Sequence, residues 1–214
     1  MSSDFETPDR GTRLAQIAES LRAIAVNGLH WAETEYDRAR YERALALATE
    51  LLSLADTRDA AEIERAVRGD LGLRTPFVGV DAAIFDVQGR ILLIQRRDNG
   101  RWGMPGGAAD VGETPAEAAE REVREETGLR VRATRLVGVY DSRRVGSPDA
   151  AHLYHLVFLC DTVGGALTRT GETSGFGYFT EEAVATLALH AGHGPRIPDA
   201  FRAYRGEAPT AVFQ

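Results

Sequence analysis

The sequence predicts an α/β domain built on a mixed sheet, preceded by a small all-helical domain. Residues 1–70 carry apolar side chains at the three- and four-residue spacing of helices. From Phe77 onward, short apolar runs alternate with turn residues, which is typical of strands. One well-capped helix near residues 114–128 lies between these strands, and this order favours helices packed on a sheet.

The N-terminal region is expected to form three helices. Apolar residues recur at helical spacing in two segments: Leu14, Ile17, Leu21 and Ile24 in the first, and Tyr41, Ala44, Ala48, Leu51 and Ala55 in the second. Asn27-Gly28 is expected to separate these helices, since such a pair is a turn signal. A third, short helix is predicted over 60–67, ending at Gly69. We therefore predict a helical domain at 1–70, a linker at 71–76 and a second domain at 77–214.

The second domain is expected to begin with two strands. Apolar runs flank Asp86-Val87-Gln88-Gly89, a strand–turn–strand pattern. Further strands are predicted at 136–140, 152–160 and 176–179, and a helix from Thr180 to His190. The single cysteine, Cys160, falls in an apolar strand, so we expect it to fill the core and not to act as a nucleophile. One cysteine cannot form an internal disulfide, which fits a reducing compartment.

Composition and charge exclude several classes of function. The net charge is −7, so the molecule as a whole has no basic field that would attract nucleic acid. All 25 basic residues are arginine, which excludes Schiff-base lysines and a Walker-type phosphate lysine. No apolar run approaches the length of a membrane span, and the polar N-terminus is unlike a secretory signal. A cytoplasmic protein without a membrane partner is expected.

The helix near residues 114–128 has clear start and stop signals. Thr114 and Glu117 form a capping-box pattern, with Pro115 in the first turn. Gly128 occupies the position where a left-handed residue ends many helices. The two signals together predict a helix of about 13 residues.

This helix is predicted to have one apolar stripe and one acidic face. The stripe comprises Ala116, Ala119, Val123 and Thr127, and the acidic face comprises Glu122, Glu125 and Glu126. Each pair of like charges at this spacing destabilises a helix by roughly a few tenths of a kcal/mol. A divalent cation would turn that repulsion into binding, and Mg²⁺ prefers carboxylates, waters and phosphate oxygens.

The segment before the helix is predicted to bring backbone close to the same cation. Residues 104–107, Met-Pro-Gly-Gly, are expected to form a tight turn without side chains, so that a carbonyl can reach the metal. Arg121 is adjacent to Glu122 and could orient a carboxylate by two hydrogen bonds. The alternative is a capped surface helix whose charges are solvated.

The segment from Gly107 to Leu129 reads G-x5-E-x7-R-E-U-x-E-E-x-G-U, where U is apolar. This pattern resembles the signature of the Nudix hydrolases, Mg²⁺-dependent enzymes that cut pyrophosphate linkages in nucleoside diphosphate derivatives. The resemblance implies an α/β/α sandwich and Mg²⁺, with Mn²⁺ as a possible substitute. It implies Glu122 and Glu126 as principal metal ligands, Glu125 as a third ligand or the base that positions water, and Gly107 as a carbonyl ligand.

The helical N-terminus is similar to that of a Nudix subgroup that includes CDP-choline and ADP-ribose pyrophosphatases and is often dimeric. This similarity favours a homodimer and a CDP-choline-like substrate. The region Arg144 to Ser147, about 15–18 positions after the box, has neither the proline associated with ADP-ribose enzymes nor the tyrosine associated with dinucleoside polyphosphate enzymes. An ADP-ribose or nucleotide-sugar pyrophosphatase, a non-catalytic nucleotide-sugar sensor and an enzyme acting on RNA 5′ ends remain alternatives.

Four residues outside the box are candidates for substrate binding. Trp102 could line a base-binding cleft or pack at the edge of the core. Arg97, or its neighbour Arg96, could contact phosphate. Arg143 is in a loop, where substrate contacts concentrate, and Glu172 resembles a glutamate that some Nudix enzymes use near the metal or base.

The histidines give no ligand set in the sequence. His152 and His155 are expected on opposite faces of one strand. His190 and His193 flank a glycine-rich turn and are expected at the surface.

Overall fold

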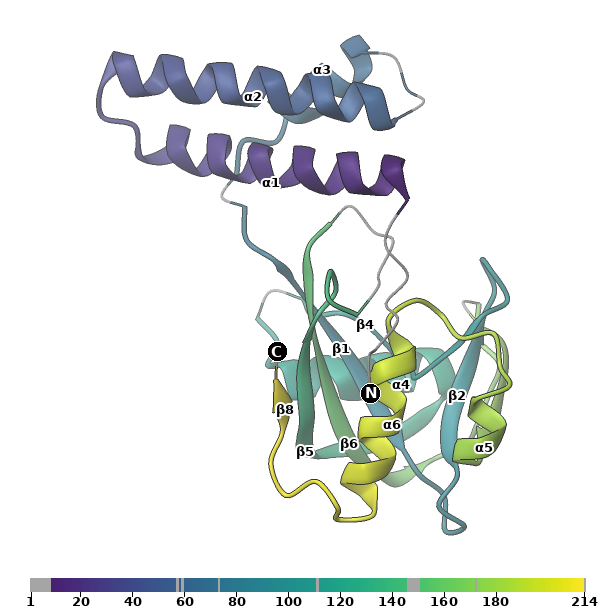
Figure 1. The fold of residues 1–214 in the computed structure, drawn as a ribbon. Helices are drawn as coiled ribbons and strands as arrows, with labels where there is room; N and C mark the ends of the chain where they lie inside the picture. Colours follow the sequence, from purple (N-terminus) through teal and green to yellow (C-terminus); the bar gives the residue numbers. More distant parts are fainter. Residues whose placement is uncertain are drawn as a thin grey trace. The chain divides into compact units, whose positions relative to one another are not determined.

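The computed structural model describes residues 9–56, 58, 60–72, 74–110, 112–145, 151–171 and 173–213 (Figure 1). The chain divides into two compact units. The first comprises residues 1–76 with 148–152, and the second comprises 77–147 with 153–214. Within the described residues, no helix is long and apolar enough to cross a membrane.

The first unit is helical, as predicted, with α1 at Arg10–Trp31, α2 at Glu35–Ala55 and α3 at Ala60–Arg68. Asp9 caps α1 by accepting hydrogen bonds from the next turn, and Thr34 caps α2 in the same way. α1 and α2 lie side by side as an antiparallel pair (Figure 1).

The predicted break at Asn27-Gly28 is wrong, because both residues lie inside α1. Gly28 is needed for packing, since a Cβ there would lie 2.2 Å from Cε1 of Tyr41 in α2. The Asn27 side chain donates to the Arg74 carbonyl at 2.9 Å and accepts from the Arg74 N–H at 2.7 Å. Gly28 therefore allows α1 to pack on α2, and Asn27 binds the expected linker segment to α1 through the backbone of Arg74.

The helical unit has a small core and an exposed apolar surface. Its buried cluster comprises Ala25, Val26, Leu45, Ile63 and Val67. Large apolar side chains are exposed on α1 and α2 at spacings of seven and eleven residues, which place them on one stripe of each helix. We call these residues the apolar stripes: Ile17, Ile24 and Trp31 on α1, and Tyr36, Leu47 and Leu54 on α2.

The second unit contains strands and helices that form two sheets and two helical layers. The strands are β1 Phe77–Ile84, β2 Ile91–Arg96, β3 Trp102–Gly103, β4 Gly106–Ala108, β5 Leu129–Asp141, β6 Leu153–Gly165, β7 Thr173–Phe179 and β8 Val212–Phe213. The helices are α4 Pro115–Thr127, α5 Glu181–Val184 and α6 His193–Tyr204. Across the described strands, one mixed sheet has the order β4-β1-β6-β5-β8 and an antiparallel sheet has the order β3-β2-β7.

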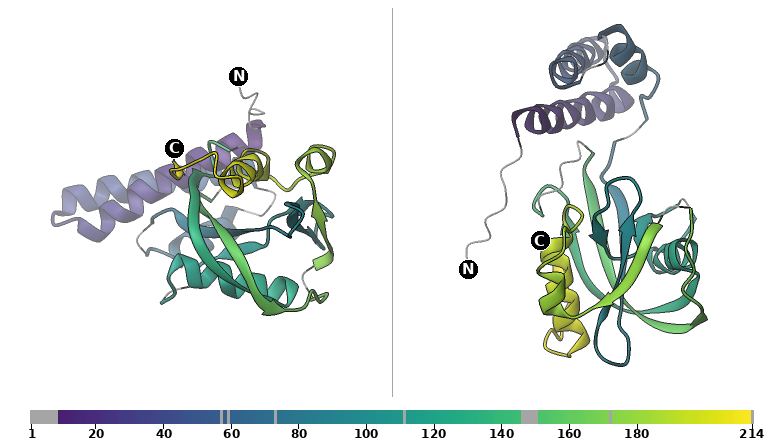
Figure 2. Two further views of the ribbon diagram at one scale, coloured as in Figure 1. Left: turned by 90° about the horizontal axis from the view of Figure 1, so that it is seen from below. Right: turned by 90° about the vertical axis from the view of Figure 1, so that its right-hand side faces the viewer.

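Two cores lie on opposite faces of the strands. Ala82, Leu92 and Val123 belong to the core beneath α4, whereas Ala83 and Ile197 belong to the core beneath α6. In the right-hand view of Figure 2, α4 (teal) and α6 (yellow) lie on opposite sides of the strands. This layered arrangement confirms the predicted α/β/α fold on a mixed sheet, preceded by helices.

The strand–turn–strand prediction around Asp86–Gly89 is confirmed. The two strands enter different sheets, because β1 pairs with β4 and β6 whereas β2 pairs with β3 and β7. The helix prediction that follows Thr180 is wrong. The helix predicted from Thr180 to His190 ends at Val184, and α6 follows it at His193–Tyr204. Pro195 and Pro198 hid α6 in the sequence. Pro195 lies in the first turn of the helix, where N–H groups lack partners, whereas Pro198 lies inside the helix.

Candidate active site

Local capping signals fix the ends of α4. The Thr114 side chain accepts from the Glu117 N–H, and the Glu117 carboxylate accepts from the Thr114 N–H at 2.8 Å. Gly128 ends the helix in the left-handed conformation, with φ of 77°. The helix spans Pro115–Thr127, so the predicted start, end and length are confirmed.

The buried face of α4 differs slightly from the predicted stripe. Ala119, Val123 and Thr127 are buried as expected, but Ala118 takes the place of Ala116. Glu126 is also buried, although the sequence predicted it beside the stripe on an acidic face. A buried carboxylate needs hydrogen-bond partners, and the adjacent edge of β4 supplies one.

The predicted turn at Met104–Gly107 is a bend at Pro105 followed by the edge strand β4. β4 pairs with β1 through Gly107 and Val80, with Gly106 opposite Asp81. In an antiparallel ladder, alternate residues turn their N–H and C=O groups away from the partner strand. The N–H of Gly106 points away from β1 in this way and donates to Oε2 of Glu126 at 2.8 Å.

The same alternation decides which glycine carbonyl faces α4. The Gly106 C=O lies on the same side as its N–H, beside Glu126, whereas the Gly107 C=O points into the ladder toward Val80. Ala108 follows the Gly106 pattern, since its carbonyl accepts from Nη2 of Arg121 at 2.9 Å. The geometry therefore favours Gly106 as the carbonyl ligand in place of Gly107.

A side chain at either glycine would meet a neighbouring group. A Cβ at Gly106 would lie 2.1 Å from the carbonyl oxygen of Val80. A Cβ at Gly107 would lie 2.4 Å from Oε1 of Glu122. Glu122 thus lies directly against the glycine backbone, in space that any side chain would fill.

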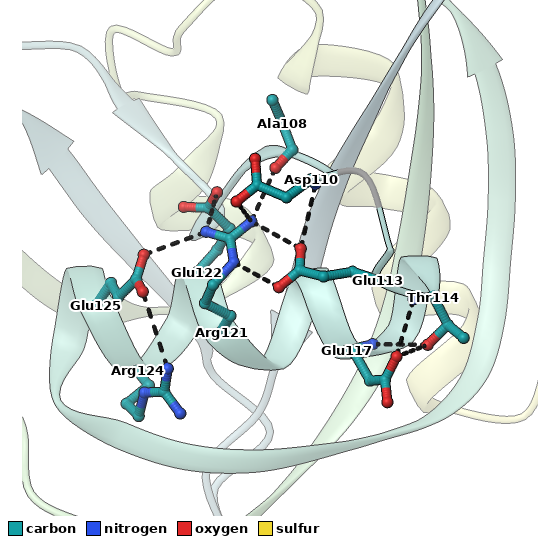
Figure 3. Close-up of polar contacts among 9 residues, drawn as sticks. All are labelled: Ala108, Asp110, Glu113, Thr114, Glu117, Arg121, Glu122, Arg124 and Glu125. Atoms are coloured by element: carbon teal, nitrogen blue, oxygen red, sulfur yellow. Dashed lines mark hydrogen bonds and ion pairs between the residues drawn. The ribbon is translucent and has the colours of Figure 1, made fainter.

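Arg121 lies at the centre of a network of carboxylates (Figure 3). Its Nε and Nη2 donate to the two oxygens of Glu113 at 2.8 and 3.1 Å. Its Nη1 donates to Oε1 of Glu122 at 2.9 Å and to Oε2 of Glu125 at 3.1 Å. These hydrogen bonds raise the pKa of Arg121, and the Arg121 hydrogen bond lowers the pKa of Glu113. The sequence predicted one oriented carboxylate, whereas Arg121 holds three.

Glu125 is set apart from the other two glutamates. Its side chain is 51% exposed and also lies 3.8 Å from Nη2 of Arg124. No group of three or more His, Cys, Asp or Glu side chains in the described segments is arranged to hold a metal ion. The predicted convergence of three glutamates is therefore not seen, and the compact oxygen set is Glu122, Glu126 and the Gly106 carbonyl. Oxygen donors of this kind suit Mg²⁺, which also keeps waters and phosphate oxygens.

The substrate-binding candidates are spread over the second unit. Trp102 is half-buried and packs edge-on against Phe179, with ring centroids 4.9 Å apart. Arg97 is exposed in the turn after β2, and Arg96 pairs with Asp98 at 2.9 Å. Arg143 is half-buried in the turn after β5, and Glu172 lies outside the described residues.

A buried ionic cluster that was not predicted from the sequence lies on the α6 side of the mixed sheet. Asp81 of β1 is buried and pairs with Nη1 of the buried Arg196 of α6. His155 Nδ1 and His193 Nε2 lie 3.6 and 3.9 Å from the two carboxylate oxygens. The prediction that His193 lies at the surface is wrong. An aspartate in the middle of an apolar strand was the available signal.

Two members of the cluster, Asp81 and His193, have strongly shifted pKa values. Burial opposes ionisation of Asp81, but the Arg196 charge and the His155 imidazole keep its pKa well below the usual range. Burial and the nearby Arg196 charge lower the pKa of His193 to about 3. His193 is therefore neutral at ordinary pH, and its Nδ1 accepts from the Met104 N–H at 3.3 Å.

Comparison with known proteins agrees with this architecture. Residues 75–200 match the NUDIX domain, and residues 12–67 match a UDP-X-like N-terminal oligomerisation domain.

The YjhB protein of Bacillus subtilis (strain 168) is 31% identical over 178 residues, covering 83% of this chain and 85% of its own length. The structure of an ADP-ribose pyrophosphatase from Streptococcus suis has a TM-score of 0.58 at 30% identity, over 65% of this chain and all of that one. A UDP-X diphosphatase structure covers 96% of this chain and 99% of its own, with a TM-score of 0.59 at 24% identity, and shows the shared fold. The chain therefore belongs to the Nudix family and is a pyrophosphate-cleaving hydrolase.

Proposed function

We propose that this enzyme hydrolyses a nucleoside diphosphate linked to a sugar, of the ADP-ribose or UDP-sugar type. The products would be a nucleoside monophosphate and a sugar phosphate. The observation that carries this proposal is the contact between β4 and α4, where Glu122 and Glu126 lie against the backbone of two glycines. That contact presents oxygen ligands to a cation and leaves no side chain to obstruct a pyrophosphate.

The residues at this contact have distinct proposed roles. Glu122, Glu126 and the Gly106 carbonyl would hold Mg²⁺, with Mn²⁺ as a substitute. When bound, the cation would neutralise charge on the phosphates and lower the pKa of the attacking water. Arg121 orients Glu122 and Glu125 through the hydrogen bonds in Figure 3. The exposed Glu125 would complete the ligand set or accept a proton from the attacking water.

The choice of substrate rests on similarity. The names of two solved relatives refer to ADP-ribose and to UDP-X. CDP-choline is favoured by the helical N-terminus alone, and that compound serves as a competing substrate in the test. The retained glutamates and their contacts argue against a non-catalytic sensor.

A substrate panel tests the proposal directly. ADP-ribose, UDP-glucose, CDP-choline and a 5′-triphosphorylated RNA would be incubated with Mg²⁺ or Mn²⁺, and the products separated. We expect the sugar derivatives to be cleaved to nucleoside monophosphate. Faster turnover of CDP-choline would overturn the substrate assignment, and absence of cleavage with either metal would favour the sensor.

Glu126→Gln tests the metal assignment. We expect kcat to fall by about 100-fold or more, because a charged ligand is lost while the side-chain volume is kept. Glu120→Gln is the matched control on the same helix, since Glu120 accepts from the Ala133 N–H and is not part of the proposed metal set. Wild-type turnover in Glu126→Gln, or an equal loss in both variants, would contradict the assignment.

We further propose that the helical unit forms a homodimer through the apolar stripes. Ile24, Trp31 and Leu54 are 62%, 72% and 70% exposed in the single chain. Exposed apolar patches of this kind commonly mark protein–protein contacts. The match of residues 12–67 to an oligomerisation domain supports the same role.

A further inference from the structure

His155 lies over the backbone of β1 and reaches toward β4. In the mixed sheet, the register places Ala108 of β4, Gly79 of β1 and His155 of β6 in one row. A Cβ at Gly79 would lie 2.9 Å from His155 Nδ1, so the imidazole occupies the space above this glycine. The ring is thereby displaced from its own strand toward the strand that borders the candidate active site.

The row containing His155 is adjacent to the row containing Gly107. Opposed residues such as Ala108 and Gly79 have Cα atoms about 4.5–5.5 Å apart. His155 lies on the α6 side of the sheet, whereas Glu122 and Glu126 come from α4 on the other side. Because β4 is the edge strand, a ligand held at its outer edge can pass around that edge onto the α6 side and needs to cross only one strand to reach His155. A nucleoside attached to a pyrophosphate is longer than this spacing between strands.

Buried charges fix the orientation of the His155 ring. Its Nδ1 lies 3.6 Å from Oδ2 of Asp81, and Arg196 pairs with the same carboxylate from α6. A carboxylate beside Nδ1 favours the tautomer that carries its proton there, which leaves Nε2 as an acceptor. His155 is 20% exposed, and its Nε2 has no hydrogen-bond partner among the residues that the structure describes.

The buried cluster is poorly explained by stability alone. Replacing a buried ion pair with packed apolar residues is often neutral or stabilising. Asp81 and Arg196 lie within a core that is otherwise apolar on this side of the sheet, and two glycines, Gly79 and Gly103, leave room for the two histidines. Buried charges that hold a partly exposed imidazole in one orientation are typical of ligand sites.

We propose that His155 Nε2 accepts a hydrogen bond from a ribose hydroxyl or a base N–H of the substrate's nucleoside, and that Asp81 positions His155 for this contact. The inference rests on the proposed function, because it takes the pyrophosphate to be bound at the β4–α4 contact. An acceptor nitrogen selects a donor group, so phosphate oxygens are not its partner. His155 therefore determines specificity and takes no part in bond cleavage.

The test compares the best substrate of the panel with two analogues. One lacks the ribose 2′-hydroxyl, and the other has the N–H donor of its base blocked by methylation, at N3 of uracil or twice at the exocyclic amine of adenine or cytosine. The enzymes are wild type, His155→Ala, His155→Gln and the control His30→Ala, which alters an exposed histidine of the helical unit. One lost hydrogen bond corresponds to roughly 0.5–1.5 kcal/mol, or about 2- to 12-fold in KM. We expect His155→Ala to raise KM for the parent substrate by that factor, with kcat within about twofold.

The analogue that lacks the true donor should have the raised KM with the wild type and no further rise with His155→Ala. Comparison of the hydroxyl analogue with the base-methylated analogue identifies the donor group. His155→Gln should restore part of the affinity because its amide oxygen can accept. If the effects of His155→Ala and both analogues are additive, or if KM does not change, the inference is wrong.

Asp81→Asn tests the positioning role. It should raise KM for the parent substrate selectively, whereas an equal loss with the parent and the analogues would mean that Asp81 acts only on folding. Calorimetric titration of the nucleoside monophosphate into wild type and His155→Ala gives the same comparison without turnover. If the panel shows no hydrolysis, the proposed function fails, and equal titration affinities would separately overturn the inference for His155.

Discussion

The two units of this chain depart from the usual placement of apolar and charged residues in different ways. The helical unit gathers exposed large apolar side chains on the stripes of α1 and α2, with Trp31 and Leu54 largely accessible, whereas those of the catalytic unit, such as Val87 and Phe213, lie in separate turns and strands. The catalytic unit buries charged ones, with Asp81, Glu126 and Arg196 inside. Soluble domains normally bury the first kind and expose the second.

In each unit, the unusual placement of residues indicates what that unit binds. Exposed apolar stripes are stabilised when another surface covers them, which points to a protein partner. Buried charges persist where they are paired and hydrogen-bonded, and they commonly mark sites that bind or react. The comparison thus assigns assembly to the helical unit and chemistry to the catalytic unit.

The largest expected effect comes from removing Arg196, the positively charged member of the buried ion pair with Asp81. Arg196→Ala leaves Asp81 buried without its main partner, and we expect the free energy of unfolding to fall by about 3–5 kcal/mol. Arg202→Ala is the control on the same helix, where an exposed pair with Asp199 contributes about 0–1 kcal/mol. Chemical denaturation measures both, and equal losses would remove the distinction between buried and exposed charge.

Charges placed on the apolar stripes should separate the subunits. We expect the double variant Ile24→Glu, Leu54→Glu to weaken self-association by about 100-fold, equivalent to about 2.7 kcal/mol. Arg38→Glu, at an exposed position on the other side of α2, should leave association unchanged. Light scattering during gel filtration gives the mass, and an unchanged mass for the double variant would contradict the stripe as an interface.

Acid should destabilise the catalytic unit through His193. Its pKa is about 3 in the fold and about 6.5 when unfolded, so only the unfolded chain gains this proton as pH falls below 6.5. The stabilisation is complete above pH 6.5 and decreases by about 2 kcal/mol between pH 6.5 and 5. Denaturation of wild type and His193→Gln at both pH values should show this difference, and parallel losses would argue against a buried neutral His193.

The smallest expected effect concerns the cap of α4. Thr114→Ala removes one half of the capping box, and we expect a loss of about 1 kcal/mol in stability. Thr180→Ala removes the cap of the four-residue α5 and should have a smaller effect. Thermal denaturation distinguishes the two, and a larger loss at Thr180 would mean that α4 is held by its packing and not by its cap.

Features encoded by neighbours in the chain were predictable from the sequence. The ends of α4 depend on Thr114, Glu117 and Gly128, all within one or two turns of the residues that they cap. The change from helical to strand periodicity near Phe77 likewise marks the boundary between the two units. The fold class follows from these local signals.

Features set by distant residues were not predictable. Gly28 was interpreted as a break, but its role is to admit the ring of Tyr41, 13 positions away in α2. The burial of Glu126 depends on the edge of β4, and the choice of Gly106 over Gly107 depends on the register with β1. The pairing of Asp81 with Arg196 joins residues 115 positions apart. Each requires knowledge of pairing that one sequence does not contain.

The glycine contact between β4 and α4 also limits how this enzyme can be altered. A Cβ at Gly106 would meet the carbonyl oxygen of Val80 in the neighbouring strand, and a Cβ at Gly107 would meet the Glu122 carboxylate. The first clash is with main chain, which no side-chain rotation can relieve, and relief of the second would move Glu122 from its proposed place as a metal ligand. Directed evolution of new substrates should therefore accumulate changes in the surrounding loops and strands and retain glycine at these two positions.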